Sequence, residues 1–283
     1  MADRNEVVAK DRVAVVTGAA SGIGLGLAER FAAEGMRVVM ADVEEPPLKE
    51  AADRLAGEGA KVEPVVVDVA NAEQVDRLRD RAVDAFGAVH LLCNNAGVGG
   101  STGPLWLISP REWEWVLGVN LGGVVNGVRS FMPLLLEQDA AHVVNTASIF
   151  GVFAGALGPY SVSKHAVVAY TESLYFQLRD AGARVGVSVL CPGAVQTRFN
   201  DSARNRPADV GPPPDPGPND RAQRERLAQL TPMGRDPKEV ADIVVDGVRR
   251  SRFYILTSTN RNEAVRRRGE EVVAGAPPRD PFP

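Results

Sequence analysis

The sequence predicts an α/β fold in which a parallel sheet of about seven strands carries helices on both faces. Short runs of β-branched and other apolar residues alternate with amphipathic patterns along most of the chain, and this alternation builds parallel sheets. The predicted strands are apolar at almost every position, as expected for strands covered on both sides. We expect one domain over residues 1–283, because the alternation runs without a linker through the first 190 residues.

Each predicted element follows from a local pattern. Gly35 closes the first helix, and Ser109, Pro110 and Glu112 form a capped start for a long one. The predicted strands span residues 12–18, 37–42, 61–69, 89–97, 142–148, 184–193 and 252–258. Helices are predicted over 22–35, about 47–56, 72–87, from 109 onward, within 156–180, over 237–250 and over 261–275. This order predicts a doubly wound sheet of the Rossmann type.

The composition argues against several classes of function. The net charge of −4 gives no basic field, so we expect no nucleic-acid partner. Cys93 and Cys191 end apolar runs and are expected to be buried, reduced thiols, and the histidines show no metal-ligand spacing. The N-terminus has no apolar signal region, and no apolar stretch is long enough to cross a bilayer. We therefore expect a cytoplasmic protein with neither a metal nor a membrane partner.

A glycine-rich turn joins the first predicted strand to the first predicted helix. In "TGAASGIG", Gly18, Gly22 and Gly24 permit a tight turn and let backbone N–H groups approach a pyrophosphate at the helix N-terminus. Asp42 ends the second strand, where a carboxylate can bind the 2′-hydroxyl of a ribose and would repel a 2′-phosphate. No Lys or Arg stands beside this turn or beside Asp42, so we expect NAD rather than NADP.

Tyr160 and Lys164 lie one helical turn apart near the start of the predicted helix in 156–180. A tyrosine on an apolar face and a solvated lysine would explain such a pair without any chemistry. A lysine ammonium would also favour a phenolate, and a phenolate can act as a base. The helix alone does not decide between these interpretations.

Seven motifs in order resemble those of the short-chain dehydrogenase/reductase family. They are "TGAASGIG", "DV" at 68–69, "NNAG" at 94–97, Asn120 in "VNLGG", Ser148 in "NTAS", "YSVSK" at 160–164 and "PGAVQT" at 192–197. The resemblance covers residues 10–200 and continues to about 257. It implies a catalytic tetrad of Asn120, Ser148, Tyr160 and Lys164. The cofactor-binding residues that it implies, together with the turn and Asp42, are Gly18, Ser21, Gly22, Ile23, Gly24, Asp42, Asp68, Val69, Asn95, Ala96, Gly97, Tyr160, Lys164, Pro192, Gly193, Val195 and Thr197.

The resemblance gives the Tyr160–Lys164 pair a function. Tyr160 would exchange the proton of an alcohol, with Lys164 and the charge of an oxidised nicotinamide lowering the pKa of its phenol. Ser148 would donate a hydrogen bond to the same substrate oxygen, and Asn120 would hold a water that relays the proton. Within the family fold, a non-catalytic NAD-binding sensor is the alternative, although such proteins typically lose the tyrosine or the lysine. Family members of this size commonly form homotetramers, so a homotetramer or homodimer is expected.

The residues expected around the substrate are apolar. Phe150, Phe153, Leu157 and Phe199 follow the catalytic motifs, which favours a hydrophobic secondary alcohol or ketone, with aryl and polycyclic compounds as candidates. The segments "VNLGGVVNG", "GALGPYS" and "FYILTS" are similar to those of Cα-dehydrogenases that act on lignin-derived aryl ethers. Among the tryptophans, Trp106 is a candidate for the substrate cleft, and Trp115 is expected to pack within its helix.

Residues 198–237 interrupt the alternation with a proline cluster. A loop of this length in a compact domain is usually functional or disordered. Because it begins directly after Thr197, we interpret 198–235 as a mobile lid that Leu227 and Leu230 close against the substrate. A solvated loop, or one held by a neighbouring subunit, is the alternative. Residues 276–283 are expected to form a flexible tail.

Overall fold

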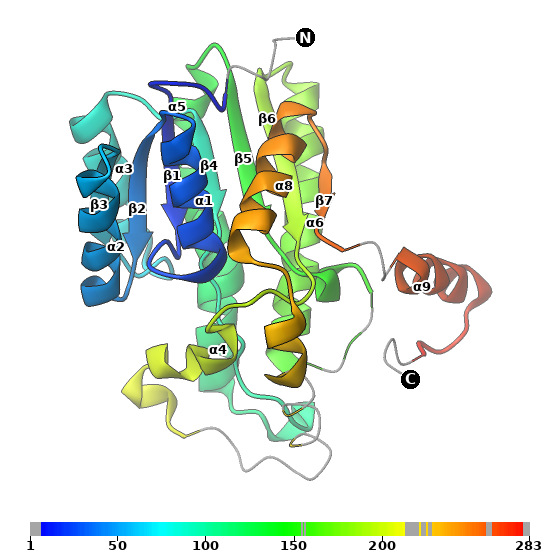
Figure 1. Ribbon diagram of the computed structural model, residues 1–283. Helices are drawn as coiled ribbons and strands as arrows, with labels where there is room; N and C mark the ends of the chain where they lie inside the picture. The colour runs from blue at the N-terminus through cyan, green and yellow to red at the C-terminus, as the bar shows by residue number, and fades with distance from the viewer. Residues whose placement is uncertain are drawn as a thin grey trace.

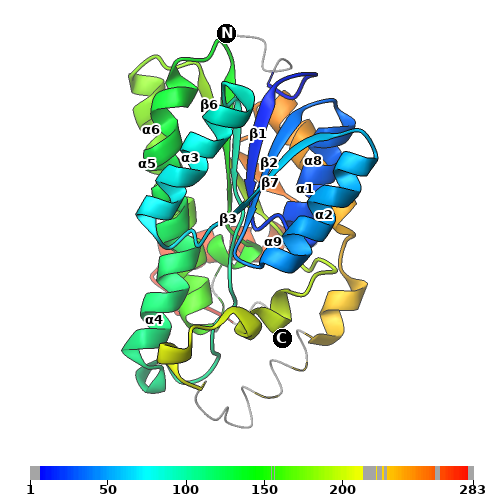
Figure 2. The ribbon, with the colours of Figure 1, turned by 90° about the vertical axis from the view of Figure 1, so that its left-hand side faces the viewer.

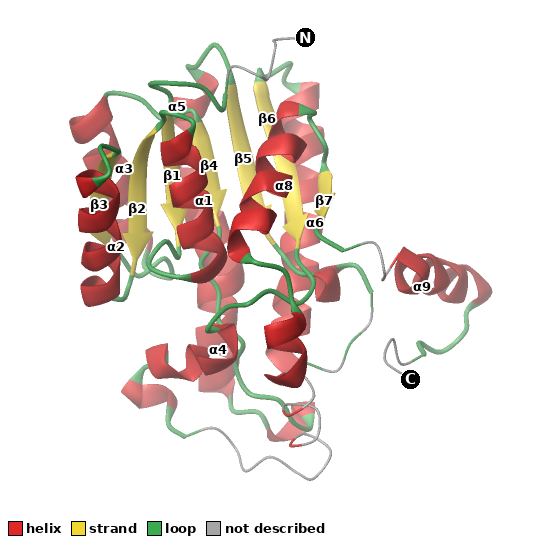
Figure 3. Cartoon of the chain, viewed as in Figure 1, coloured by secondary structure: helices red, strands yellow, loops and turns green. Residues whose placement is uncertain are grey.

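The centre of the protein is a parallel sheet whose order is β3-β2-β1-β4-β5-β6-β7. The computed structural model describes residues 7–153, 155, 157–212, 221, 225, 228–258 and 262–279. Within these ranges every neighbouring pair of strands is parallel, as Figures 1 and 3 show. The seven described strands are β1 (Val13–Thr17), β2 (Arg37–Asp42), β3 (Lys61–Val66), β4 (Leu91–Asn94), β5 (Ala141–Thr146), β6 (Val185–Cys191) and β7 (Tyr254–Leu256). The predicted Rossmann-type sheet is confirmed.

Helices cover both faces of the sheet, and Figure 2 shows the two layers from the side. One layer contains α1 (Gly22–Ala33), α2 (Glu45–Gly57) and α8 (Pro237–Arg249). The other contains α3 (Ala72–Phe86), α5 (Gly123–Leu136) and α6 (Gly158–Asp180). The remaining described α-helices are α4 (Pro110–Leu117), which leads into α5, and α9 (Asn262–Ala274), which extends beyond β7 in Figure 1.

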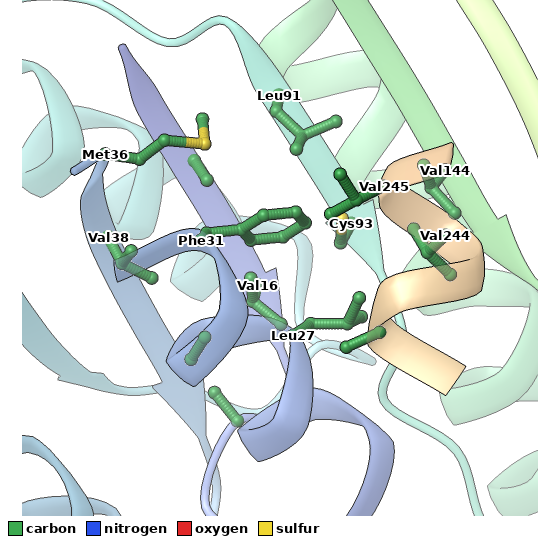
Figure 4. Close-up of a cluster of buried hydrophobic side chains, with 14 of the residues drawn as sticks. Val16, Leu27, Phe31, Met36, Val38, Leu91, Cys93, Val144, Val244 and Val245 are labelled. Carbon is green, nitrogen blue, oxygen red and sulfur yellow. The ribbon is translucent and has the colours of Figure 1, made fainter. Parts of the chain in front are cut away.

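The core is divided by the sheet because successive strand residues point to opposite faces. Val16 of β1 packs with Leu27 and Phe31 of α1 and with Val244 of α8, as Figure 4 shows. Val15, one residue earlier, belongs to the cluster on the opposite face. The apolar strands thus supply both layers of the core, which confirms the expectation drawn from their composition.

The long helix predicted from residue 109 is interrupted. Ser109 caps α4 as expected, since its Oγ accepts a hydrogen bond from the Glu112 N–H over 3.2 Å. Between α4 and α5, however, residues Gly118–Gly122 form a π-helical turn that contains Asn120. Such turns are often found at functional sites, and no pattern in the sequence predicted this one.

The helical run Pro110–Leu136 is long and apolar enough, by length and composition, to cross a membrane, and 44% of its most apolar part is buried inside the protein. The expectation that no apolar stretch has this length is therefore corrected. Buried core helices of proteins without any membrane contact have the same length and composition.

The predicted lid and tail lie only partly within the described residues. Residues 199–210 form two short 3-10 helices, η5 (Phe199–Asn205) and η6 (Ala208–Val210), and a third, η7, covers Thr231–Met233. Leu227 and residues 280–283, on which part of those predictions depended, lie outside the described ranges.

Candidate active site

A cavity of about 960 Å³ lies at the carboxyl ends of the strands. Parallel strands place their carboxyl ends at the same edge, so the loops that follow β1, β2, β4, β5 and β6 converge there. Nearly all the predicted cofactor residues line this cavity, namely Gly18, Ser21, Gly22, Ile23, Asp42, Asp68, Val69, Asn95, Ala96, Gly97, Tyr160, Lys164, Pro192, Gly193, Val195 and Thr197. Gly24 is the exception.

The glycine turn has the geometry that a pyrophosphate site requires. Gly18 and Gly22 have φ angles of +69° and +56°, a backbone region that favours glycine. A Cβ atom on Gly24 would lie 1.9 Å from the carbonyl oxygen of Gly18. Gly24 therefore lets α1 pack directly on the turn rather than lining the cavity. The turn leaves the N-terminus of α1 at the cavity wall, where backbone N–H groups and the helix dipole suit a phosphate.

Asp42 is held rigidly at the end of β2. Its Oδ2 accepts a hydrogen bond from the Ala20 N–H over 2.9 Å, and its Oδ1 accepts one from the Glu44 N–H over 3.0 Å. Burial raises the pKa of this carboxyl, while the hydrogen bonds from the backbone act in the opposite direction. The carboxylate lines the cavity, so its position fits a hydrogen bond with a ribose hydroxyl.

Asparagines brace the strands beneath the cavity. The Nδ2 of Asn94 donates to Oδ1 of Asn145 over 2.9 Å, and the Nδ2 of Asn145 donates to Oγ1 of Thr171 on α6 over 3.1 Å. Asn95 is tied to β1, because its Nδ2 donates to the carbonyl oxygen of Thr17 over 2.9 Å. These bonds link β1, β4, β5 and α6, the elements that carry most of the cavity wall.

Lys164 is almost completely buried, with 3% of its surface exposed. Its Nζ donates to the carbonyl oxygen of Thr146 at the end of β5 over 2.9 Å and lies 5.8 Å from the centre of the Tyr160 ring. Burial lowers the pKa of Lys164 to about 8. A charged lysine held in this way can bind the hydroxyls of a sugar in the cavity.

The pKa of Tyr160 is shifted in the direction opposite to the expected one. Its side chain is partly exposed toward the cavity, but the protein packed around it raises its pKa to about 12. A hydrogen bond with Ser148 lowers the pKa without offsetting burial. Lys164 and an oxidised nicotinamide together are expected to lower the Tyr160 pKa, whereas in the protein without a dinucleotide the desolvation of the phenolate raises it.

Ser148 and Asn120 are held by the backbone around them. The Oγ of Ser148 accepts a hydrogen bond from the Phe150 N–H over 3.2 Å. In the π-helical turn, the Asn120 side chain accepts from the Val98 N–H over 2.8 Å and donates to the Val98 carbonyl and to Oγ of Ser163, both over 2.9 Å. Asn120 therefore fixes the loop after β4 and the start of α6 relative to each other.

One end of the cavity is lined by apolar residues, and these differ in part from the residues predicted for the substrate. Phe150, Leu157 and Phe199 line it, and the Phe199 ring centre lies 5.2 Å from that of Tyr160. Phe153 does not line it, because its ring packs behind that of Phe150 at 5.5 Å. Trp115 is buried against Val98 and Val116, as expected, and it also lines the cavity. Trp106, the candidate for the substrate cleft, is 84% exposed and does not line it.

Ionic contacts of residues 199–210 were not predicted. The guanidinium of Arg204 forms an ion pair with Glu44, and that of Arg206 forms one with Glu112. These partners are 160 and 94 residues apart in the sequence, so no local pattern could reveal them. Among the described residues, no group of three His, Cys, Asp or Glu side chains could hold a metal.

The fold and the site define a Rossmann-fold protein with a large cavity, bordered by a glycine-rich turn, at the carboxyl edge of its sheet. A sequence profile of the short chain dehydrogenase family matches residues 12–208. The chain therefore belongs to this family of oxidoreductases, as its motifs predicted.

Three similar proteins illustrate the relationship. A crystal structure of a short chain dehydrogenase/reductase from Burkholderia phymatum in complex with NAD is 44% identical, covers 97% of this chain and 98% of its own, and has a TM-score of 0.93. A 1-deoxy-11-beta-hydroxypentalenate dehydrogenase from Streptomyces exfoliatus is 47% identical over 66% of this chain and 68% of its own length. A C alpha-dehydrogenase from Sphingobium sp. strain SYK-6 is 31% identical over 97% and 89%, which confirms the narrower resemblance.

Replacing Lys164 by Met should stabilise the protein at pH 7. Because the folded-state pKa of about 8 lies below the ordinary 10.5, the unfolded chain binds the proton more tightly. Burial of the charged lysine therefore lowers the free energy of unfolding. This loss of stability is complete below pH 8 and shrinks as the pH rises toward 10.5. The loss of stability amounts to about 3 kcal/mol. Replacing Lys164 by Met removes it but also removes a hydrogen bond worth about 1 kcal/mol. We expect a melting temperature a few degrees higher by calorimetry, with the gain shrinking as the pH approaches 10.5.

Lys49→Met, at an exposed position of α2, is the matched control and should leave the melting temperature nearly unchanged. A Lys164→Met protein that melts well below the unmodified one at pH 7 would show that the ammonium stabilises the fold.

Proposed function

We propose that this protein is an NAD-dependent oxidoreductase that interconverts a hydrophobic secondary alcohol and its ketone. The observation that carries the proposal is the meeting of three groups in one cavity: the Tyr160 phenol, the buried Lys164 ammonium and the apolar wall that contains Phe199. Asp42, at the other end of that cavity, and the glycine turn between them support the choice of NAD. The relative crystallised with NAD supports it as well.

The proposed reaction assigns a separate task to each residue. A bound NAD supplies the acceptor for the hydride that leaves the alcohol carbon. Tyr160 takes the hydroxyl proton, so that the C–H and O–H bonds break as the carbonyl forms. Ser148 donates a hydrogen bond to the same oxygen, where negative charge develops. Lys164 holds the sugar next to the nicotinamide and adds positive charge near the phenolate. Asn120 positions the loop after β4, and we propose that it also holds the water that relays the proton.

The substrate is proposed to be bulky and apolar. Phe150, Leu157, Phe199 and Trp115 line its end of the cavity, and burial of apolar surface is the main source of affinity in such pockets. Relatives that are named as dehydrogenases of hydroxypentalenate and of a steroid support an alcohol of this kind. Aryl and polycyclic alcohols are the compounds to screen first.

A non-catalytic NAD sensor is the alternative function. It is less well supported, because Ser148, Tyr160 and Lys164 are all present and lie around one cavity.

We also propose that the protein is cytoplasmic and forms a homotetramer or homodimer. The contact surface between subunits would include the exposed aromatic side chains Tyr175, Phe176 and Tyr254 on α6 and β7. Light scattering at micromolar concentration measures the assembly, and a monomer would contradict this proposal.

Residues 198–235 are proposed to act as a lid over the substrate.

The replacement Tyr160→Phe tests the reaction itself. Removal of the phenolic hydroxyl should lower kcat/KM for alcohol oxidation by about 10²–10⁴-fold, while NAD binding changes little. The reaction is followed by the absorbance of reduced nicotinamide with a panel of hydrophobic alcohols. Tyr170→Phe, on the same helix but away from the cavity, is the control. Full activity of Tyr160→Phe, or no activity of the unmodified enzyme with any alcohol, would favour the sensor.

Asp42→Ala tests the choice of cofactor. The unmodified protein should bind NAD at least tenfold more tightly than NADP, and Asp42→Ala should narrow that ratio, because the carboxylate both binds the ribose hydroxyl and repels a 2′-phosphate. Titration calorimetry with each dinucleotide measures the ratio, and Asp53→Ala, on the exposed side of α2, is the control. Equal affinity of the unmodified protein for the two cofactors would contradict the assignment.

A further inference from the structure

Residues 199–210, which we call the wall segment, supply part of the lining of the cavity. The segment contains η5 and η6 and lies below the sheet in Figure 1, where η6 packs against α4. The ring of Phe199, at its start, packs against that of Tyr160 at a tilt of 56°. Ser202 accepts a hydrogen bond from the Gly99 N–H over 2.8 Å. The segment thus forms part of the wall next to the proposed catalytic tyrosine.

Two arginines anchor the wall segment at different places. Arg206 pairs with Glu112 on α4 and stacks on Trp115, with its guanidinium carbon 4.9 Å from the ring centre. This anchor lies on the substrate side. Arg204 reaches in the other direction, to Glu44 in the turn between β2 and α2. That turn follows Asp42, which is the proposed contact of the adenosine ribose.

The pair formed by Arg204 and Glu44 is bidentate and partly buried. Two parallel hydrogen bonds of 2.9 and 2.7 Å join Nε and Nη2 to the two carboxylate oxygens. The side chains are only 20% and 18% exposed, so water screens the charges less than at a typical surface pair. The Nη1 of Arg204 also donates to the carbonyl oxygens of Arg198 and Asp201 over 3.1 and 3.0 Å. One guanidinium therefore ties the backbone of η5 to the turn after β2.

The same turn is connected to Asp42 through the backbone. The Glu44 N–H donates to Oδ1 of Asp42, whose Oδ2 is bonded to the Ala20 N–H of the glycine turn. A ribose bound at Asp42 would restrict this turn and, with it, the carboxylate of Glu44. A continuous set of contacts then runs from Asp42 through Glu44 and Arg204 to η5 and to the Phe199 ring on Tyr160.

We infer that Glu44 and Arg204 are positioning residues that couple NAD binding at Asp42 to the order of the wall segment beside Tyr160. The inference rests on the proposed function, since it takes NAD as the ligand. The coupling is reciprocal by linkage, so ordering of the wall segment strengthens NAD binding by the same factor. The pair touches no reacting atom and acts through Phe199 and Asp42.

The test measures hydrogen exchange of the wall segment with and without saturating NAD. In the unmodified protein, NAD should slow exchange of residues 199–210 by roughly tenfold, a coupling of ordinary size. Glu44→Gln and Arg204→Gln should each abolish most of this NAD-dependent slowing, although titration calorimetry still shows NAD bound. The double variant should lose no more than either single variant, because both remove one interaction. Glu45→Gln removes the same charge at the next, exposed position and should keep the full effect.

A merely structural pair would give a different result. Exchange would then rise equally with and without NAD in the Glu44→Gln and Arg204→Gln proteins, and the slowing by NAD would persist, which would overturn the inference. Should Arg204→Gln fail to fold, Arg204→Lys keeps the charge but loses the two parallel bonds, and it should retain only part of the slowing. Retention of all of it would also overturn the inference. If NAD binds to the unmodified protein but does not slow exchange, only this inference is overturned. If NAD does not bind at all, the proposed function is overturned as well.

Discussion

Burial of one ammonium group, that of Lys164, is the constraint on which the site depends. A buried lysine needs an acceptor for its protons, and the carbonyl oxygen of Thr146 provides one at the end of β5. This position fixes the start of α6 against the sheet, and so it fixes Tyr160 four residues earlier. The close approach of Gly97, where a Cβ atom would lie 3.3 Å from the Lys164 Nζ, keeps the loop after β4 against the same group. Burial lowers the pKa of Lys164 to about 8. The ammonium that can bind a sugar therefore lowers the stability of the folded protein.

The parallel sheet brings the remaining groups to that ammonium. Every strand ends at the same edge. Asp42 is the last residue of β2, and the glycine turn, Asn95 and Ser148 follow β1, β4 and β5. Hydrogen bonds from Asn94 to Asn145 and onward to Thr171 hold two of these strands and α6 in register. The cavity is therefore rigid on the sheet side. Its other side, formed by the wall segment, is held by the ion pairs of Arg204 and Arg206, and this asymmetry suits a site that must admit a substrate.

Local patterns predicted the fold and most of the site, because strand ends, glycine turns and helix starts are encoded by neighbouring residues. Gly18, Asp42 and Tyr160 lie where their elements were expected to place them. Three features escaped prediction for physical reasons. The π-helical turn Gly118–Gly122 interrupts a helix that the pattern from Ser109 onward predicted as continuous. The pair of Glu44 with Arg204 joins distant segments. The raised pKa of Tyr160 depends on burial, which spacing along a helix does not reveal.

We propose that the protein alone keeps Tyr160 protonated and that a bound NAD, through its positive nicotinamide, would make the phenol acidic enough to act as a base. Titration of ¹³C-labelled tyrosine rings by NMR measures this directly, with Tyr160→Phe to assign the signal. Without NAD, we expect Tyr160 to titrate above the ordinary value of 10, near 12. With NAD bound, we expect its pKa to fall by two or more units, roughly the effect of a nearby opposite charge. A Tyr160 pKa that is the same with and without bound NAD would contradict the account.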